Sequence, residues 1–103
     1  MKPLVFDSEA EAELRSAIEK YEQERVGLGD EFWAEVQQVL RLIGEHPDLG
    51  GTISRVRIQG TARRLLVRRF PYFVIYRERP DHLQVVAVAH QSRRPGYWRS
   101  RVG

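Results

Sequence analysis

The sequence predicts a small α+β domain: an N-terminal strand, then an antiparallel helical hairpin, then an antiparallel meander of three to four strands. Two observations lead to this prediction. Apolar residues recur at helical spacing in the first half of the chain, and at every second position after the pair Gly50-Gly51. Short turn sequences separate the later alternating runs, which favours antiparallel pairing of consecutive strands. A chain of 103 residues without a linker predicts one domain, residues 1–103.

A first strand is predicted at residues 4–6, which are apolar and follow Pro3. Proline before a strand suits a sheet edge, because it cannot donate a ladder hydrogen bond. The first helix should begin at Asp7 or Ser8, since Ser8 and Glu11 have the spacing of a capping box. Its apolar face is formed by Ala10, Leu14, Ala17, Ile18 and Tyr21.

Two glycines, Gly27 and Gly29, should end the first helix, and Asp30 should cap a second one. The second helix should end near Gly44 and Pro47. Its apolar stripe is formed by Phe32, Val36, Val39, Leu40 and Ile43. Two helices of similar length joined by a short glycine-containing segment predict an antiparallel helical hairpin.

The predicted strands of the second half cover residues 55–58, 63–70, 72–79 and 83–90. The helical hairpin should cover one face of their sheet and leave the other face open, because a sheet must bury at least one face. Alternation assigns Leu65, Val67, Val74 and Tyr76 to the helix-packed face. It places Arg64, Arg68 and Arg77 on the open face. The last strand is ambiguous because both of its faces are apolar.

Charge is divided unevenly along the chain. Residues 1–50 carry five Lys and Arg and twelve Asp and Glu, a net charge of −7. Residues 51–103 carry twelve Arg and two acids, a net charge of +10. Arginine binds carboxylates and phosphates through paired hydrogen bonds, and it stacks on flat bases. The second half therefore predicts a basic surface for an anionic partner.

Several classes of function are disfavoured by what the sequence lacks. Patterns typical of phosphate-binding loops, dinucleotide sites, zinc sites and serine nucleophiles are absent, so no metal or cofactor is expected. The chain has no cysteine, which excludes disulfides and thiolate chemistry. No apolar run approaches the ~20 residues of a membrane helix, and no signal peptide is apparent. A cytoplasmic protein without a membrane partner is the expectation.

The segment that follows the last predicted strand is basic and aromatic. His90, at its start, could act as a general acid or base in phosphodiester cleavage, or could simply bond to backbone. Tyr97 and Trp98 could stack on nucleobases, or could fold back over a sheet edge. The residues alone leave these alternatives open. The predicted binding surface contains Arg64, Arg68, Arg77, Arg93, Arg94 and Trp98.

Three segments match one known family in the right order along the chain. The front half has Phe6, Glu13-Leu14, Gly29, Phe32, Val36 and His46-Pro47. Residues 68–76, RRFPYFVIY, form the second segment, and AVAH at 87–90 followed by RRPGYW at 93–98 forms the third. Together they resemble the RelE/ParE toxin superfamily. The resemblance implies a compact α+β toxin of a bacterial type II toxin–antitoxin system, neutralised by a cognate antitoxin and able to form higher-order complexes with it.

The resemblance implies two alternative targets and a third, inactive state. ParE-like members poison DNA gyrase, RelE-like members cleave messenger RNA on the ribosome, and some homologues could bind without activity. The residues matching a nuclease site are His90, Arg64, Arg68, Arg93 and Tyr97. Positions where such nucleases carry charge hold Phe73, Leu66 and Gln91 instead. Losing a cation that stabilises a transferring phosphate costs on the order of 10²–10³ in rate, so gyrase inhibition is the favoured prediction.

Overall fold

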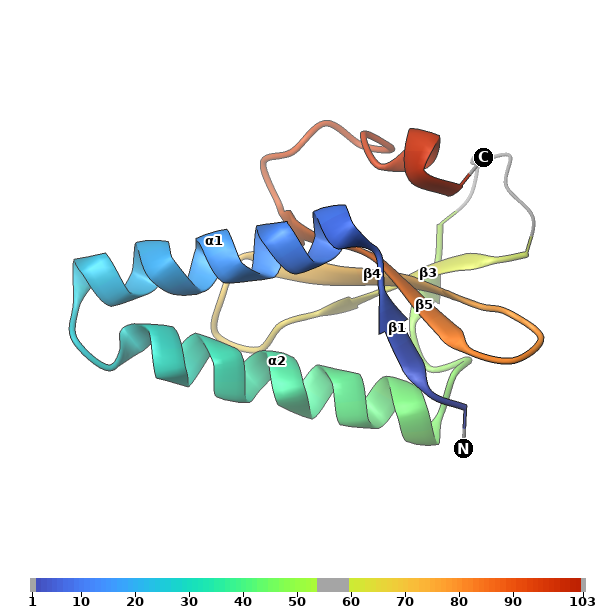
Figure 1. The fold of residues 1–103 in the computed structure, drawn as a ribbon, viewed down its shortest axis with the longest axis horizontal. Coiled ribbons are helices and arrows are strands. Elements are labelled where there is room, and N and C mark those ends of the chain that lie inside the picture. The colour runs from blue at the N-terminus through green and yellow to red at the C-terminus, as the bar shows by residue number, and fades with distance from the viewer. Residues whose placement is uncertain (1, 54–59, 103) are drawn as a thin grey trace.

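The computed structural model describes residues 2–53 and 60–102 and has the predicted α+β architecture (Figure 1). In chain order, the elements are β1 (Leu4–Phe6), α1 (Ser8–Glu24), α2 (Leu28–Glu45), β2 (Gly51–Thr52), β3 (Ala62–Leu66), β4 (Tyr72–Glu78), β5 (Leu83–His90) and the short 3₁₀ helix η1 (Arg99–Val102). The strands form one sheet in the order β1-β5-β4-β3-β2. The fold class is confirmed, whereas the strand predicted at residues 55–58 lies outside the described residues.

The first strand lies at a sheet edge, as predicted, and pairs in parallel with β5. The remaining pairs, β2 with β3, β3 with β4 and β4 with β5, are antiparallel and form the predicted meander. The sheet is therefore mixed, because the helical hairpin carries the chain from β1 across one sheet face before the meander begins. This crossover brings the N-terminus beside the last strand of the chain.

The start of α1 differs from the predicted capping box. Asp7 occupies the N-cap position, but its side chain makes no capping hydrogen bond. Instead, its carboxylate accepts hydrogen bonds from Nε2 of Gln84 at 2.9 and 3.0 Å. Ser8 donates its hydroxyl to the Glu9 carboxylate rather than pairing with Glu11. A tertiary contact with β5 thus replaces the local cap that the sequence predicts.

The second helix begins earlier than predicted, at Leu28, so Asp30 lies in its first turn and is not its cap. The N-cap residue is Gly27, whose φ of 90° is the left-handed conformation that glycine favours. The carboxylate of Glu22, in α1, accepts hydrogen bonds from the backbone N–H groups of Gly27 and Gly29, both at 3.0 Å. A side chain of the first helix therefore caps the second one.

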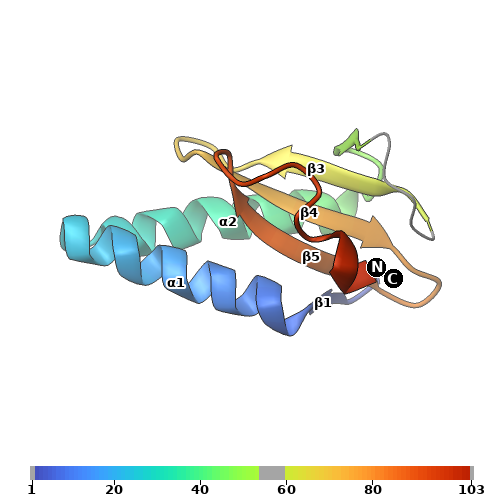
Figure 2. The same cartoon turned by 90° about the horizontal axis from the view of Figure 1, so that it is seen from above.

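Two hydrophobic cores lie on opposite faces of the sheet. The larger core packs the helical hairpin against the sheet, and it buries Val67, Val74 and Tyr76 as predicted, with Leu65 partly buried at its border. The second core contains Ala62, Ile75, Val86, Ala87, Ala89, Trp98 and Val102. The expectation of an open second face is therefore wrong. The segment after β5 folds back across that face, as Figure 2 shows from above.

A β-bulge explains why the faces of β5 were ambiguous in the sequence. Ile75 pairs with Ala87 but the next residue, Tyr76, pairs with Val85, which leaves Val86 as an extra residue in β5. The alternation of faces shifts at this point. The helix-facing core takes Val85 and Val88, and the other core takes Val86, Ala87 and Ala89. Apolar residues on both faces are needed because both faces are covered.

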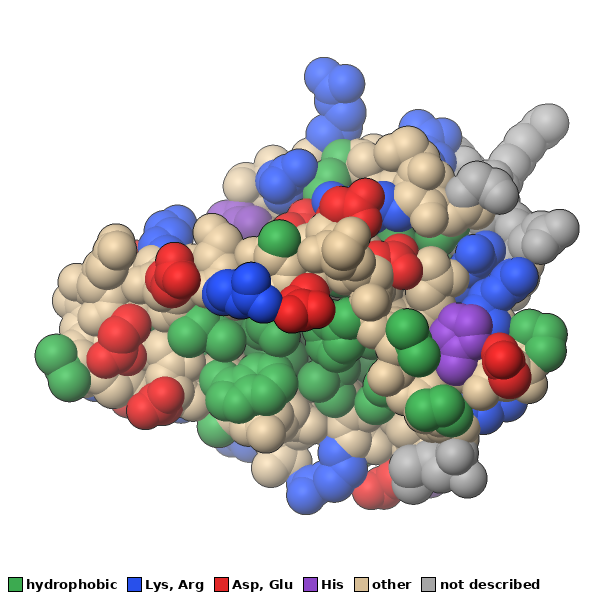
Figure 3. Space-filling model, in the orientation of Figure 1, with side chains coloured by type: hydrophobic (Ala, Val, Ile, Leu, Met, Phe, Trp, Pro, Cys, Tyr) green, Lys and Arg blue, Asp and Glu red, His purple; other side chains and the backbone are tan. Residues whose placement is uncertain are grey.

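The charge asymmetry of the sequence persists on the surface. Figure 3 shows acidic side chains spread over the helical hairpin, while basic side chains gather along the C-terminal segment and the far end of the sheet. The segment after β5 carries Arg93, Arg94, Arg99 and Arg101. A basic segment that contains no acid therefore covers the second sheet face.

Candidate functional site

The C-terminal tail, residues 91–102, encloses a cavity of about 130 Å³ against the sheet. We call this cavity the tail pocket. Of the sequence-predicted site residues, those that line it are Arg64, His90, Arg93, Arg94, Tyr97 and Trp98. Strands β3, β4 and β5 supply one wall and the tail supplies the other. The fold thus brings together most of the predicted residues, although they lie far apart in the sequence.

Two predicted residues lie elsewhere. Arg68 is exposed beside a groove between α2 and β3, where Leu42, Leu49 and Leu66 are also exposed. Arg77 has only 8% of its surface exposed, and its Nε donates to Oε1 of Gln84 at 2.6 Å. Burial lowers the pKa of the Arg77 guanidinium. The expectation that Arg77 lies on an open face is therefore wrong: Arg77 is buried and starts a partly buried polar chain that continues through Gln84 to Asp7.

The exposed arginines of the tail pocket stack on aromatic rings. The guanidinium of Arg64 lies 4.7 Å from the ring centroid of Phe73, and that of Arg93 lies 3.9 Å from the ring centroid of Tyr97. Such contacts stabilise by about 0.5–1 kcal/mol at exposed sites. Phe73 occupies a position where a nuclease would carry charge, and here it supports a neighbouring cation instead.

Trp98 is 2% exposed and is among the largest fully buried side chains of the protein. Of the two alternatives left open by the sequence, folding back onto the sheet is nearer to the structure, but Trp98 covers a face of the central strands and not a sheet edge. A buried indole offers no face on which a nucleobase could stack. Trp98 therefore fixes the tail against the sheet.

Glu13 of α1 anchors the tail to the sheet, and sequence reasoning gave it no such role. Its Oε2 accepts hydrogen bonds from the hydroxyl of Tyr97 at 2.6 Å and from Nη2 of Arg101 at 3.1 Å. Its Oε1 accepts from Nη1 of Arg101 at 2.9 Å and from the backbone N–H of Val88 at 3.1 Å. Arg101 also donates to the carbonyl of Val86 at 3.0 Å. One carboxylate thus satisfies donors from the tail and from the bulged strand.

His90 is held by its neighbours at the end of β5. Its Nδ1 accepts a hydrogen bond from the backbone N–H of Ser92 at 3.0 Å. The ring of Tyr72 packs edge-on against the imidazole, with centroids 5.1 Å apart. Because Nδ1 is an acceptor, the proton of the neutral imidazole lies on Nε2. The backbone contact that the sequence allowed is thus present, and Nε2 is the nitrogen left for a ligand.

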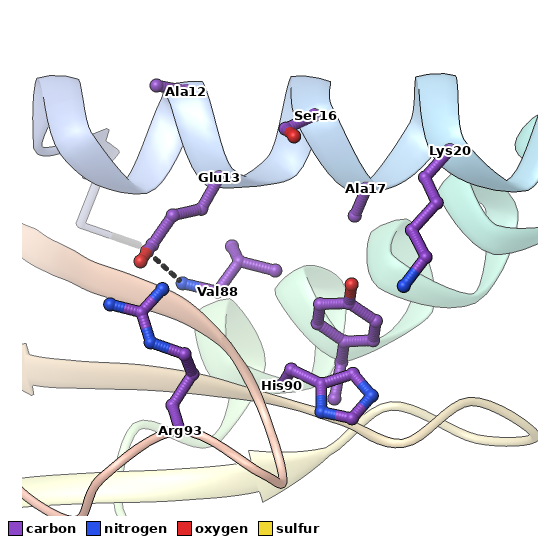
Figure 4. A pocket seen from close by; sticks show the side chains of 9 residues that line it. Ala12, Glu13, Ser16, Ala17, Lys20, Val88, His90 and Arg93 are labelled. Atoms are coloured by element: carbon purple, nitrogen blue, oxygen red, sulfur yellow. Dashed lines mark hydrogen bonds between the residues drawn. The ribbon is translucent and has the colours of Figure 1, made fainter.

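A second, larger cavity of about 300 Å³ lies on the other side of His90, between α1 and the sheet (Figure 4). We call it the helix pocket. It is lined by Ala12, Glu13, Ser16, Ala17, Lys20, Tyr72, Val88, His90 and Arg93. His90 and Arg93 line both cavities. Sequence reasoning did not single out Lys20, because nothing local indicates that α1 places it opposite the end of β5.

Within residues 2–53 and 60–102, no cluster of three or more metal-binding side chains occurs. Neither helix in the same ranges is long and apolar enough to cross a membrane.

Ionisation of Tyr97 should destabilise the folded protein at high pH. Burial, and then the hydrogen bond to the Glu13 carboxylate, raise the pKa of Tyr97 above the ordinary tyrosine value. Because the folded pKa exceeds the unfolded one, the associated stability is present below about pH 10 and is lost as the pH rises through the folded pKa. We expect the free energy of unfolding, measured with urea at pH values above about 9, to fall less steeply for Tyr97→Phe than for the unchanged protein.

Burial also raises the pKa values of Tyr21, Tyr72 and Tyr76, so part of the pH dependence should remain in Tyr97→Phe. Equal slopes for the two proteins would contradict a buried, hydrogen-bonded Tyr97.

The chain thus combines a helical hairpin on one face of a mixed sheet with a basic tail on the opposite face. The solved structure titled "Chromosomal ParDE TA system from P. aeruginosa" is similar, with a TM-score of 0.72 and 15% sequence identity. The match covers 87% of this chain and 96% of that chain. No curated protein sequence matches the chain.

The family model described as "ParE toxin of type II toxin-antitoxin system, parDE" matches residues 4–95. The chain therefore belongs to the ParE toxin family, and it is the toxin component of a type II toxin–antitoxin system. The resemblance to the RelE/ParE superfamily is confirmed. Membership in a two-component system implies a cognate antitoxin as the partner of this chain.

Proposed function

We propose that this chain inhibits DNA gyrase and that its cognate antitoxin neutralises it. The observation that carries the proposal is the match of the ParE toxin model to residues 4–95, because gyrase is the target implied by resemblance to ParE-like members. The site supports a binding mode of inhibition. Exposed arginines flank the tail pocket, and inhibition by binding needs no proton transfer by the protein.

The state of Tyr97 also favours binding over catalysis. Its hydroxyl is donated to the Glu13 carboxylate at 2.6 Å, so Tyr97 holds the tail and would have to break this bond to take part in a proton transfer. Arg68, another member of the predicted nuclease set, lies beside a different groove from His90 and Arg93.

The purified protein should inhibit gyrase in a DNA supercoiling assay at concentrations on the order of micromolar. Binding to gyrase should be disrupted by the antitoxin, so the protein encoded beside this chain, added first, should restore supercoiling. Supercoiling that proceeds normally at saturating protein would refute the proposal. A heat-unfolded sample of the same protein is the control for non-specific DNA binding by a basic chain.

Ribosome-dependent cleavage of messenger RNA is the second candidate, since Arg64, His90, Arg93 and Tyr97 line one cavity. In that mechanism His90 would be the general acid or base, and the arginines would stabilise the charge on the phosphate. Mapping of messenger RNA ends after induction distinguishes the candidates. New ends that disappear in His90→Ala and Tyr97→Phe would establish the nuclease and replace the gyrase proposal.

A binding-only homologue would differ from both candidates in the cell. Expression of the chain without its antitoxin should slow growth if it has either activity, and should leave growth unchanged if it has neither. We also propose that the protein acts in the cytoplasm, where gyrase and ribosomes are found. An acidic or amphipathic antitoxin segment is the expected ligand of its basic surface, within a higher-order toxin–antitoxin complex.

A further inference from the structure

The helix pocket combines uncompensated positive charge with several neutral hydrogen-bond donors. Figure 4 shows Lys20 extending from α1 toward His90, while Arg93 rises from the tail on the other side. The floor is apolar and includes Ala17 and Val88. We infer that this pocket binds a single carboxylate side chain, an Asp or Glu of the cognate antitoxin. That the carboxylate belongs to the antitoxin rests on the proposed function. That the pocket binds a carboxylate rests only on the side chains that line it.

The one acid in the wall of the pocket is already satisfied. Glu13 accepts four hydrogen bonds, and its charge is paired with Arg101 at 2.9 Å. A carboxylate has about four lone-pair sites, so Glu13 has no remaining capacity for the cations of the pocket. Its charge is therefore compensated from the side of the tail.

The cations of the pocket, in contrast, have no acidic partner. Within the described part of the chain, neither Lys20 nor Arg93 forms an ion pair. Arg93 is positioned by its stacking on the Tyr97 ring. On the same helix, by contrast, Arg15 pairs with Glu11 at 2.7 Å. Two unpaired cations facing one cavity favour the binding of an anion.

The helix pocket also contains neutral hydrogen-bond donors. Tyr72 has a hydroxyl that makes no hydrogen bond within the described residues, and burial raises the pKa of Tyr72, so this group remains a donor. Nε2 of His90 is the donor left after Nδ1 bonds to Ser92. Ser16 adds a hydroxyl from α1. A carboxylate could thus receive a charged donor from Lys20 or Arg93 together with a neutral donor.

A protein carboxylate fits this pocket better than a nucleic acid backbone. The α1 wall belongs to a helix with six glutamates and two basic residues, a net charge of −4. That field repels a chain of successive phosphates more strongly than it repels one side chain. A base adjoining a bound phosphate also needs an aromatic face on which to stack. The Tyr97 ring is covered by Arg93, and Trp98 is buried.

The direct test is a titration of the ¹⁵N-labelled full chain, followed by NMR, with a blocked alanine pentapeptide that has a central Asp. The matched peptide with a central Asn is the control for charge. We expect saturable shifts centred on Tyr72, His90 and Arg93 with the Asp peptide only. Lys20→Met and Arg93→Gln should each weaken binding about tenfold, the typical effect of removing a charged hydrogen-bond donor.

Arg99→Gln is the matched control, because Arg99 is an exposed tail arginine that lines neither pocket. It should change the affinity for the Asp peptide by less than about twofold. Equal weakening by Arg99→Gln would show a diffuse charge effect and overturn the inference. Tighter binding of a single-stranded tetranucleotide at the same residues would also overturn it, in favour of a nucleic acid ligand.

The partner is tested with the protein encoded beside this chain. Lys20→Met should weaken that complex about tenfold. An unchanged affinity would show that the antitoxin does not supply the bound carboxylate. Neither binding measurement contains gyrase. A failure of gyrase inhibition with peptide and antitoxin binding intact would therefore count against the proposed function alone.

Discussion

Trp98→Ala is expected to lower the free energy of unfolding by about 3–5 kcal/mol, the usual cost of removing a large buried aromatic side chain. Trp98 is 2% exposed and is the largest member of the core between the tail and the sheet. Its removal leaves a cavity that small neighbours such as Ala87 and Ala89 cannot fill. Urea unfolding followed by circular dichroism measures the change.

The control for this substitution is Val26→Ala, at the exposed end of the helical hairpin. Val26 is 87% exposed, so its truncation should alter stability by less than about 0.5 kcal/mol. If Trp98→Ala cost no more than Val26→Ala, the tail would not be packed on the sheet. A loss of stability together with a loss of the NMR signals of ordered tail residues would confirm that the packing of the tail on the second face depends on Trp98.

Glu13→Ala should destabilise the protein by about 2–4 kcal/mol, even though glutamate is a surface residue in most proteins. The substitution leaves three partners without their acceptor: the Tyr97 hydroxyl, the Val88 N–H and the Arg101 guanidinium. The side chains of Glu13 and Arg101 are only 17% and 13% exposed, so water replaces the lost acceptor poorly. Chemical unfolding at neutral pH measures the loss.

The same helix provides a matched control in Glu11, whose carboxylate pairs with Arg15 at 2.7 Å on an exposed surface. Glu11→Ala should cost about 0.5 kcal/mol or less, since exposed pairs one helical turn apart stabilise weakly. A double-mutant cycle of Glu13→Ala with Arg101→Ala should show a coupling energy above about 1 kcal/mol. Similar costs for Glu11→Ala and Glu13→Ala would contradict the anchoring role of Glu13.

Helices and strands were predictable because their residues repeat with the period of the structure they form. The stripes of α1 and α2, and the alternation that buries Val74 and Tyr76, depend only on which positions share a face. The caps were not predictable in the same way. Asp7 and Glu22 both have carboxylates that could bond locally, but Gln84 and the start of α2 compete for them. The spacing of residues along the chain does not show that these distant partners compete for the carboxylates.

The site was predictable in composition but only partly in position. The basic character of the second half followed from its charge, and the resemblance to family nucleases grouped Arg64, His90 and Arg93, which the structure brings to one cavity. Arg77 has the same parity as Arg64, yet it is buried beneath contacts that β5 supplies. Strand parity says which face a side chain takes, whereas its exposure depends on what covers that face.

By itself, the sequence determined the order and type of the elements, the charge of the two halves and the toxin family, because these properties reside in periodicity, composition and local motifs. Only the tertiary structure decided that the tail closes the second sheet face and that Glu13 receives Tyr97 and Arg101. Those partners lie 84 and 88 residues away along the chain. A contact of that kind is selected by the free energy of the whole packed arrangement, so no local segment encodes it.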